Sequence, residues 1–525
     1  MQQHASPAEI DRYPIHLKQV NALTLTEIRA FVVRRAPTLI SMFDEAAEKF
    51  YNVVDPPSTS SPTLPQAELS SADVARLLKL DLIVPFTGQV GRAQPIRAFS
   101  VLEDLKKRRR LIMHPWLWNE SADAVKMNLP SQHECIDLAE KYDWAICADI
   151  AAFYQHIRLP DPSRFVLNIG GKLFSPTAIP TGAAFCPALA QAIAMAVLTA
   201  TLDEHRDCKG QAYLDNFRFL ANSNMDLTAT RTTFLTLCEE LRIVLNDVED
   251  IAPVQRYTFL GITYDHVIRS VEPGDKIRNR LQYASHPTLR DIVQLFSRCA
   301  WLSHVFRLPL FDYYYIYKFL RRRAGAVLDE PAKPWACLSD LFHRWIHEVS
   351  QMRPICVPTR VLNWTLVTDA SSSGWGAILY ADEVCVAAGP WSTSLLGKDI
   401  AVLEMLAVQW GWQRLVAHKL QQDVRIHLVI DNTTVINVLK NGRSRGFLLN
   451  AIARSMPQFA SVRYVTSKDN TADGLSRFFS IKRSKAFPFP GTTAPELPRP
   501  SPSLSSDHGY GLDFLHPNKS NLRRQ

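Results

Sequence analysis

The chain has 525 residues, 47% hydrophobic and 21% charged, which is enough for two or three globular domains with a sizeable core. Its formal net charge of +8 permits a nucleic-acid partner without requiring one. Its nine cysteines include no Cys-x-x-Cys pair, which argues against a zinc site or a disulfide scaffold, and its start lacks the apolar core of a secretory signal.

The N-terminal part of the chain is predicted to be helical. Residues 1–65 read as a helical extension that ends in a linker rich in Pro and Ser. Thr38 is expected to cap the second helix, in which apolar residues recur every three or four positions. Ser70 and Asp73 then predict the start of a short helix over 72–80.

A basic run, Lys-Lys-Arg-Arg-Arg, occupies 106–110. Runs of this kind are usually a solvated face, or they serve as a nuclear address. The other interpretation is a clamp on a triphosphate, because several positive charges neutralise the charge that shifts as a leaving group departs. Both interpretations stay open from the run alone.

Two acids lie at the ends of predicted strands. Trp144–Ala148 is an apolar strand that runs into Asp149, and Gln211–Leu220 places Asp215 and Asn216 between apolar and aromatic residues. Asp and Asn tolerate the positive φ of a tight turn, so the second stretch is predicted to be a β-hairpin with this pair at its turn. It is either a plain hairpin or a site where two carboxylates meet across a sheet and hold divalent ions.

Five segments, in this order along the chain, resemble the motifs of retroelement reverse transcriptases. They are Arg110–Asn119 (fingers), Asp149–Leu159 (motif A), Ala178–Ala188 (motif B), Tyr213–Asn216 (motif C) and Phe259–Gly261 (primer grip). No single segment is specific, but the five together are. The resemblance implies a right-hand polymerase with fingers, palm and thumb. The apolar stretch Pro187–Leu202 is then expected to be the buried helix that follows motif B.

The resemblance also implies a role for individual residues. The catalytic and metal-binding positions would be Asp149, Asp215 and Asn216, with the carbonyl of Ile150 as a further ligand. The primer grip would be Phe259, Leu260 and Gly261. Substrate would contact Arg110 with Lys106 or Lys107 as its partner, and also Tyr154, Thr181 and Gly182. Tyr154 is either a gate that excludes a 2′-hydroxyl or a core tyrosine, and Gly182 would let the backbone approach template and nucleotide closely.

Two departures from the family pattern weaken the polymerase prediction. Asn216 stands where the family has a second acid, so the site loses one negative charge and is expected to bind metal more weakly. Leu241–Asp250 corresponds to motif D but contains no Lys. The loss of a general acid there would slow the chemistry by roughly 10²–10⁴-fold unless another group replaces it.

A new series of predicted strands and helices begins near residue 362, and four acids are spread over it. They are Asp369 after an apolar strand, Glu404 in a helix over 399–416, Asp431 after the strand Val424–Ile430, and Asp473 in a late helix. With their flanking Asp-Ala-Ser, Asp-Asn-Thr and Ala-Asp-Gly-Leu-Ser-Arg sequences they resemble the ribonuclease H tetrad of retroelements. This implies four catalytic metal ligands and, as at the polymerase site, two Mg²⁺ ions or Mn²⁺ in their place. Any one acid alone could be a helix cap or a surface charge.

The nuclease half is most similar to tyrosine-recombinase retrotransposons of the DIRS and VIPER types. The partners implied are an RNA template, a DNA primer, an RNA–DNA hybrid, dNTPs and other proteins of the same element, in the cytoplasm or nucleus and without a membrane. Three rivals remain: a degenerate nucleic-acid-binding protein, a live nuclease with a dead polymerase, and an RNA-dependent RNA polymerase, which Tyr154 disfavours.

The expected architecture is a mixed α/β and α+β multidomain chain with a ribonuclease H-like α/β domain after the polymerase. Helices with interleaved Tyr and Arg in the thumb region are either a nucleic-acid cradle or an ordinary core. The predicted domains are 1–65 (extension and linker), 66–261 (fingers and palm), 262–358 (thumb and connection), 359–478 (ribonuclease H-like) and 479–525 (a disordered basic tail rich in Pro and Ser).

Overall fold

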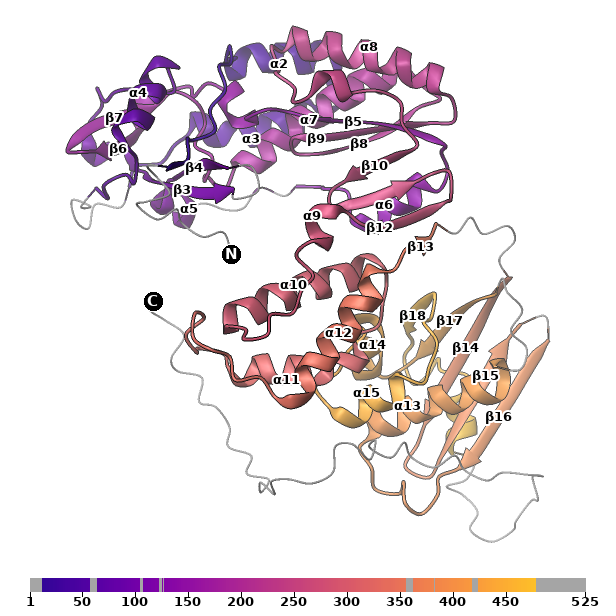
Figure 1. The fold of residues 1–525 in the computed structure, drawn as a ribbon. Coiled ribbons are helices and arrows are strands. Elements are labelled where there is room, and N and C mark those ends of the chain that lie inside the picture. The colour runs from indigo at the N-terminus through magenta and orange to yellow at the C-terminus, as the bar shows by residue number, and fades with distance from the viewer. Residues whose placement is uncertain are drawn as a thin grey trace. The chain divides into compact units, whose positions relative to one another are not determined.

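The computed structural model of the chain divides into two compact units (Figure 1). The first comprises Met1–Leu308 and Tyr315–Pro358, and the second comprises Pro309–Tyr314 and Thr359–Gln525. Both units contain helices and sheets, which confirms the predicted mixed α/β multidomain fold class. The residues that the structure describes are 12–56, 64–103, 107–121, 125, 127–355, 362–381, 383–417 and 424–477, so the predicted tail lies outside them.

The first unit is built on an antiparallel sheet of three strands. Its order is β5 (Trp144–Asp149), β9 (Asn216–Ala221) and β8 (Lys209–Tyr213). Two helices, α7 (Cys186–Asp203) and α8 (Asn224–Glu240), pack against this sheet. Apolar strand residues such as those of β9 are therefore buried, and the strand ends that carry the predicted acids are fixed by a packed core.

Helix α7 is apolar around its whole circumference because it is covered on both sides. The sheet packs on one side, and α2 (Leu25–Arg35) and α3 (Ile40–Tyr51) pack on the other. By length and composition it is the one described helix that could span a membrane, but 72% of it is buried inside the protein. It is the buried helix predicted after motif B, and the N-terminal helices share its core.

Two predicted helix starts have different outcomes. The predicted cap at Thr38 is wrong: α3 begins at Ile40 without a side-chain cap, and Thr38 lies in the preceding 3-10 turn. Ser70 and Asp73 do form a reciprocal capping box, with the Ser70 hydroxyl accepting from the Asp73 backbone and the Asp73 carboxylate accepting from the Ser70 backbone. The box works because its two donors would otherwise be unsatisfied at the helix start.

A second sheet in the first unit has the order β10–β11–β12–β13. Strands β10 (Arg256–Phe259) and β11 (Ile262–Asp265) form a hairpin, so the predicted boundary between 261 and 262 would divide a single element. The remaining strands of this unit are β1 (Ile83–Pro85), β2 (Gln94–Pro95), β3 (Arg97–Glu103), β4 (Arg108–His114), β6 (Phe165–Ile169), β7 (Lys172–Pro176), β12 (Ser270–Pro273) and β13 (Arg353–Pro354). The remaining helices are α4 (Ser71–Lys79), α5 (Trp116–Ser121), α6 (Gln132–Ala139), α9 (Asp275–Arg278), α10 (Leu289–Val305), α11 (Tyr314–Arg322) and α12 (Ala336–Ser350).

The second unit is a five-stranded mixed sheet in the order β16–β15–β14–β17–β18. The first three strands along the chain are antiparallel neighbours, whereas β17 is parallel to β14 and β18 is parallel to β17. These strands and the helices around them agree with the α/β fold class that the sequence predicts for this part of the chain. Its elements are β14 (Leu362–Ala370), β15 (Gly374–Tyr380), β16 (Val384–Pro390), α13 (Ile400–Gly411), β17 (Val424–Ile430), α14 (Thr433–Asn441), α15 (Phe447–Ala453), β18 (Ser461–Tyr464) and α16 (Asp473–Arg477).

Helices α13 and α16 cover opposite faces of this sheet. Neighbouring residues of a strand point to opposite faces, and Ala377 on β15 contacts α13 while Gly376 contacts α16. A Cβ at Gly376 would lie 2.5 Å from the Cβ of Leu475, so only glycine allows α16 to approach this closely. The predicted acids on α13 and α16 are thus brought to the sheet from its two sides.

The three arginines of the basic run that the sequence leaves open, Arg108–Arg110, lie in strand β4. Arg109 is 1% exposed, and its guanidinium donates to Asp73 Oδ2 at 2.7 Å and to the Ser100 hydroxyl at 2.9 Å. Its neighbours Arg108 and Arg110 point to the other face of β4, where both pair with Glu103. The strand alternation therefore makes Arg109 structural and leaves Arg110 available for a site.

Breaking the buried Arg109–Asp73 pair should destabilise the first unit. Asp73→Asn leaves a buried guanidinium without its counter-charge, and we expect a loss of about 3–5 kcal/mol in the free energy of unfolding, measured with denaturant. Asp44→Asn is the matched control, because the Arg29–Asp44 pair is largely exposed, and it should leave the unfolding curve unchanged. Equal effects of the two substitutions would contradict the buried pair.

Two candidate active sites

The first candidate site is the hairpin of β8 and β9. Tyr213 pairs with Asn216, so the turn consists of Leu214 and Asp215, and the left-handed residue is Leu214, at φ 55°. The prediction that Asp215 and Asn216 form the turn is therefore wrong by one residue, since Asn216 is the first residue of β9. A branched residue at positive φ is strained, so other contacts must hold the turn.

The side chain of Gln191 holds this strained turn in place. Gln191 lies on α7 and is 2% exposed. Its Oε1 accepts from the Leu214 backbone N at 2.8 Å, and its Nε2 donates to the Ala212 carbonyl at 2.9 Å. A polar residue in an otherwise apolar helix was the sequence signal for this role, although the sequence analysis did not assign it.

The pairing of β5 with β9 brings the two predicted acids together. Asp149 is opposite Asn216 in the register, and the Ile150 backbone N donates to the Asp215 carbonyl at 2.8 Å. Burial raises the pKa of Asp215, and the neighbouring carboxylate of Asp149 raises it further. Two like charges held this way at neighbouring strand ends favour a bound cation.

Two predicted substrate residues, Tyr154 and Arg110, interact electrostatically with Asp215. Burial raises the pKa of Tyr154, and Asp215 raises it further. The Arg110 guanidinium lowers the pKa of both groups. Lys107 lies in the turn before β4, with its ammonium 5.8 Å from the centre of the Tyr13 ring, and Lys106 lies outside the described residues.

Thr181 and Gly182 are bound to β4. The Thr181 hydroxyl accepts from the Met113 backbone N at 3.1 Å, and the Gly182 N donates to the Met113 carbonyl at 2.9 Å. A Cβ on Gly182 would lie 2.8 Å from the Met113 carbonyl oxygen. The structure thus gives a reason for this glycine inside the fold, whereas the sequence analysis attributed it to template and nucleotide. Asn119 adds a hydrogen bond from its side-chain N to the Gly182 carbonyl at 2.9 Å.

The predicted primer-grip residues form the turn of the β10–β11 hairpin. Phe259 ends β10, and Leu260 and Gly261 are both left-handed, at φ 48° and 84°. A fully buried arginine of β9, Arg218, stacks its guanidinium 4.7 Å from the Phe259 ring centre and 4.8 Å from that of Tyr264. This residue, which the sequence analysis missed, packs the strand after Asp215 against the second hairpin.

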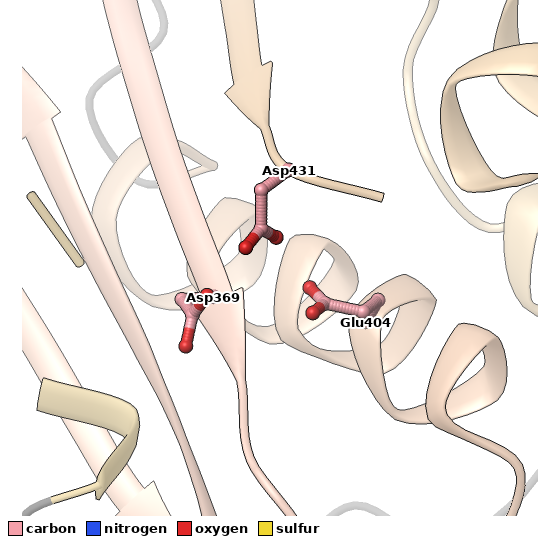
Figure 2. Close-up of side chains that lie close together, drawn as sticks. All are labelled: Asp369, Glu404 and Asp431. Atoms are coloured by element: carbon pink, nitrogen blue, oxygen red, sulfur yellow. The ribbon is translucent and has the colours of Figure 1, made fainter. Parts of the chain in front are cut away.

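The second candidate site is a cluster of three acids in the second unit (Figure 2). Asp369 lies on β14, Glu404 on α13, and Asp431 directly after β17. One carboxylate oxygen from each lies within 4.8 Å of the others. Asp369 and Glu404 are buried and Asp431 is half-buried. Residues at least 27 positions apart in the sequence are thus brought to one point by the fold.

Burial and neighbouring like charges both raise the pKa values of this cluster. Burial, together with the charges of Asp369 and Asp431, raises the pKa of Glu404 to about 9. Burial also raises the pKa of Asp369, to about 6, against the lowering effect of the Ser476 hydroxyl. Glu404 Oε2 is buried and has no hydrogen-bond partner among the described residues. An orphaned carboxylate oxygen beside two more carboxylates is the donor set that a hard divalent cation prefers.

The fourth predicted acid, Asp473, is not one of the three clustered ligands. It begins α16, and its carboxylate pairs with Arg477 at 2.7 Å. Its charge nevertheless raises the pKa of Asp369 and of Glu404, so it lies near the cluster. The structure thus brings together three of the predicted tetrad and holds the fourth in an ion pair at its edge.

Two neutral side chains near Asp473 hold the carboxylate of Asp369. Asn470 is 5% exposed and donates its side-chain N to Asp369 Oδ1 at 3.1 Å. Ser476 is fully buried and donates its hydroxyl to Asp369 Oδ2. Both lie within three residues of Asp473, the one residue of this segment to which the sequence assigned a role.

The raised pKa of Glu404 predicts a pH-dependent stability in the absence of metal. Between pH 4.5 and about 9 the unfolded chain releases a proton that the folded chain keeps, so stability falls as pH rises through this range. Glu404→Gln keeps the neutral shape, and with EDTA present it should raise the melting temperature by at least about 4 °C at pH 8 and not at pH 4. Glu383→Gln, at an exposed position, should do neither. The same difference at both pH values would refute the assignment.

No protein-family model and no curated protein matches the sequence. Among solved structures, the chain is similar to the foamy viral protease-reverse transcriptase in complex with double-stranded DNA. That match has 13% identity over 86% of this chain and 99% of the other, with a TM-score of 0.45. Two further foamy viral structures, the dRH form with double-stranded DNA and the protein with an RNA/DNA hybrid, are each 12% identical with TM-scores of 0.47. They cover 88% and 93% of this chain and 85% and 68% of their own chains.

Proposed function

We propose that the chain is an RNA-directed DNA polymerase with ribonuclease H activity on RNA–DNA hybrids, from a retrotransposon of the DIRS or VIPER type. The observation that carries the proposal most directly is the clustering of Asp369, Glu404 and Asp431 on the mixed sheet of the second unit. Their carboxylates would hold Mg²⁺, or Mn²⁺ in its place. The orphaned Glu404 oxygen supports this fit, since a metal would supply its missing partner.

The polymerase part of the proposal rests on Asp149 and Asp215. The strands that carry them are paired, and burial together with the Asp149 carboxylate raises the pKa of Asp215. These two side chains, with the Ile150 carbonyl, would hold the metal ions of nucleotidyl transfer. Asn216 would contribute no charge, so we expect this centre to require more Mg²⁺ than the nuclease centre.

The chain's own residues account for the remaining requirements of the two reactions. Bound divalent ions would lower the pKa of the attacking group and stabilise the leaving oxygen. Arg110 is exposed close to Asp215 and would bind the triphosphate, with Lys107 or Lys106 beside it. Tyr154, half-buried near Asp215, would stack against the sugar and leave no room for a 2′-hydroxyl. Asp473 and Arg477 would border the hybrid at the nuclease centre.

The proposed partners follow from these reactions. They are an RNA template, a DNA primer, the RNA–DNA hybrid and dNTPs, together with other proteins of the same element. We propose the cytoplasm or nucleus as the place of action. Phe259, Leu260 and Gly261 would contact the primer from the β10–β11 turn, and Thr181 and Gly182 would lie along the template side.

Separate substitutions should separate the two activities. The full chain with Mg²⁺ should extend a DNA primer on RNA with dNTPs and should cleave the RNA of a hybrid. Asp215→Ala should abolish extension and spare cleavage, and Asp369→Asn should do the reverse. Each loss of activity should exceed the roughly 10–100-fold loss that follows removal of a side chain that only hydrogen-bonds to a metal ligand. Cleavage that survives Asp369→Asn would overturn the nuclease assignment, and extension that survives Asp215→Ala would overturn the polymerase assignment.

The gate assigned to Tyr154 has its own test. Tyr154→Ala opens space beside the sugar, so incorporation of NTPs relative to dNTPs should rise by at least about tenfold in primer extension. Tyr51→Ala, at an exposed position on α3, is the control and should leave this ratio unchanged. A wild-type preference for NTPs would contradict the gate and favour an RNA polymerase.

One alternative is favoured by a specific observation. Asn216 replaces an acid, and no Lys lies between Leu241 and Asp265. A chain that has lost synthesis but kept its acidic cluster would cleave hybrids and bind primer-template without extending it. The extension assay with wild-type protein distinguishes this alternative directly.

A further inference from the structure

Asn246 makes two hydrogen bonds to Asp149 in the first site. Its backbone N donates to the Asp149 carbonyl at 2.8 Å, and its side-chain Nδ2 donates to Asp149 Oδ2 at 2.7 Å. We propose that Asn246 is a positioning residue that fixes the carboxylate of Asp149 for metal binding. The proposal rests on the polymerase function proposed above. At the sequence level this segment is distinguished only by its lack of a Lys.

The backbone places Asn246 independently of its side chain. Leu245 forms an antiparallel bridge with Ile150, and the Ala151 backbone N donates to the Val244 carbonyl at 2.9 Å. The Val244 backbone N donates in turn to His156 Nε2 at 2.9 Å. Asp149 therefore lies between β9 on one side and this segment on the other. A substitution of the Asn246 side chain leaves these backbone contacts in place.

The two carboxylates of the site are held in the same way. Asn216 donates its Nδ2 to Asp215 Oδ1 at 2.9 Å, as Asn246 does to Asp149 Oδ2. An amide is neutral, so it orients a carboxylate without cancelling the charge that attracts a cation. A Lys or Arg at either position would form an ion pair and reduce that charge.

Loss of the Asn246 amide should weaken metal binding without unfolding the unit. The terminal torsion of an Asp side chain is broad, so an unheld carboxylate samples orientations that do not bind. Removing a hydrogen-bond partner of a metal ligand typically costs 10–100-fold in metal affinity or activity. Asn246→Ala removes the donor. Asn246→Asp keeps the size of the side chain and replaces the donor with a second negative charge beside Asp149.

The first measurement is metal binding, which does not depend on activity. Mn²⁺ is titrated into the full chain carrying Asp369→Asn, which disables the second site, and free Mn²⁺ is followed by electron paramagnetic resonance. Adding Asn246→Ala should raise the dissociation constant of the remaining site by about 10–100-fold. Asp215→Ala marks complete loss of the site. Asn52→Ala is the matched control, because Asn52 is exposed and its amide contacts only Glu48 among the described residues.

The second measurement is the Mg²⁺ dependence of primer extension at saturating dNTP. Asn246→Ala and Asn246→Asp should both shift half-maximal Mg²⁺ upward, while hybrid cleavage by the same polypeptide keeps its wild-type Mg²⁺ dependence. Unchanged Mn²⁺ affinity with Asn246→Ala, or an Asn246→Asp chain that binds metal at least as well as wild type, would overturn the proposal. Wild-type protein that binds Mn²⁺ at this site but never extends a primer would overturn the polymerase function instead.

Discussion

The antiparallel pairing of β5 with β9 is the constraint on which the first site depends. It sets Asp149 opposite Asn216 and joins the Ile150 N–H to the Asp215 carbonyl, so two acids 66 residues apart become neighbours. Register matters here because a shift of one residue would turn every side chain to the other face. The strained turn at Leu214 is tolerated because Gln191 satisfies its backbone from the buried helix α7.

The two centres handle like charge differently. In the first, the two carboxylates each accept a hydrogen bond from a neutral amide, of Asn216 and Asn246. In the second, Asp369 accepts from Asn470 and Ser476, but Glu404 is buried with an oxygen that has no partner among the described residues. A buried acid of this kind stays protonated near neutral pH unless a cation stabilises its charge. The carboxylate oxygens of the second centre are therefore the better suited of the two to bind a divalent cation.

Some arginines near the first site are buried and stabilise the fold, whereas another is exposed and can bind substrate. Arg109 and Arg218 are both fully buried, the one paired with Asp73 and the other enclosed by Phe259, Tyr257 and Tyr264. Neither can reach a substrate. Arg110, one residue from Arg109, is exposed on the opposite face of β4 and remains close to Asp215. Strand alternation thus decides which arginine of one basic run can bind an anion.

The sequence by itself determined the strands and the helix that carry the acids, because apolar periodicity and strand-end acids are local signals. Strands β5 and β17 begin and end at, or within one residue of, the expected positions, and helix α13 begins at Ile400 against an expected start at 399. It also determined the mixed fold class. Only the tertiary structure decided that Leu214 takes the left-handed position, that Asp473 pairs with Arg477 outside the cluster, and that Asn246, Gln191 and Ser476 hold the site. These contacts join residues that are distant in sequence, or they depend on which of several nearby side chains the fold places within hydrogen-bonding distance. No local sequence pattern encodes either.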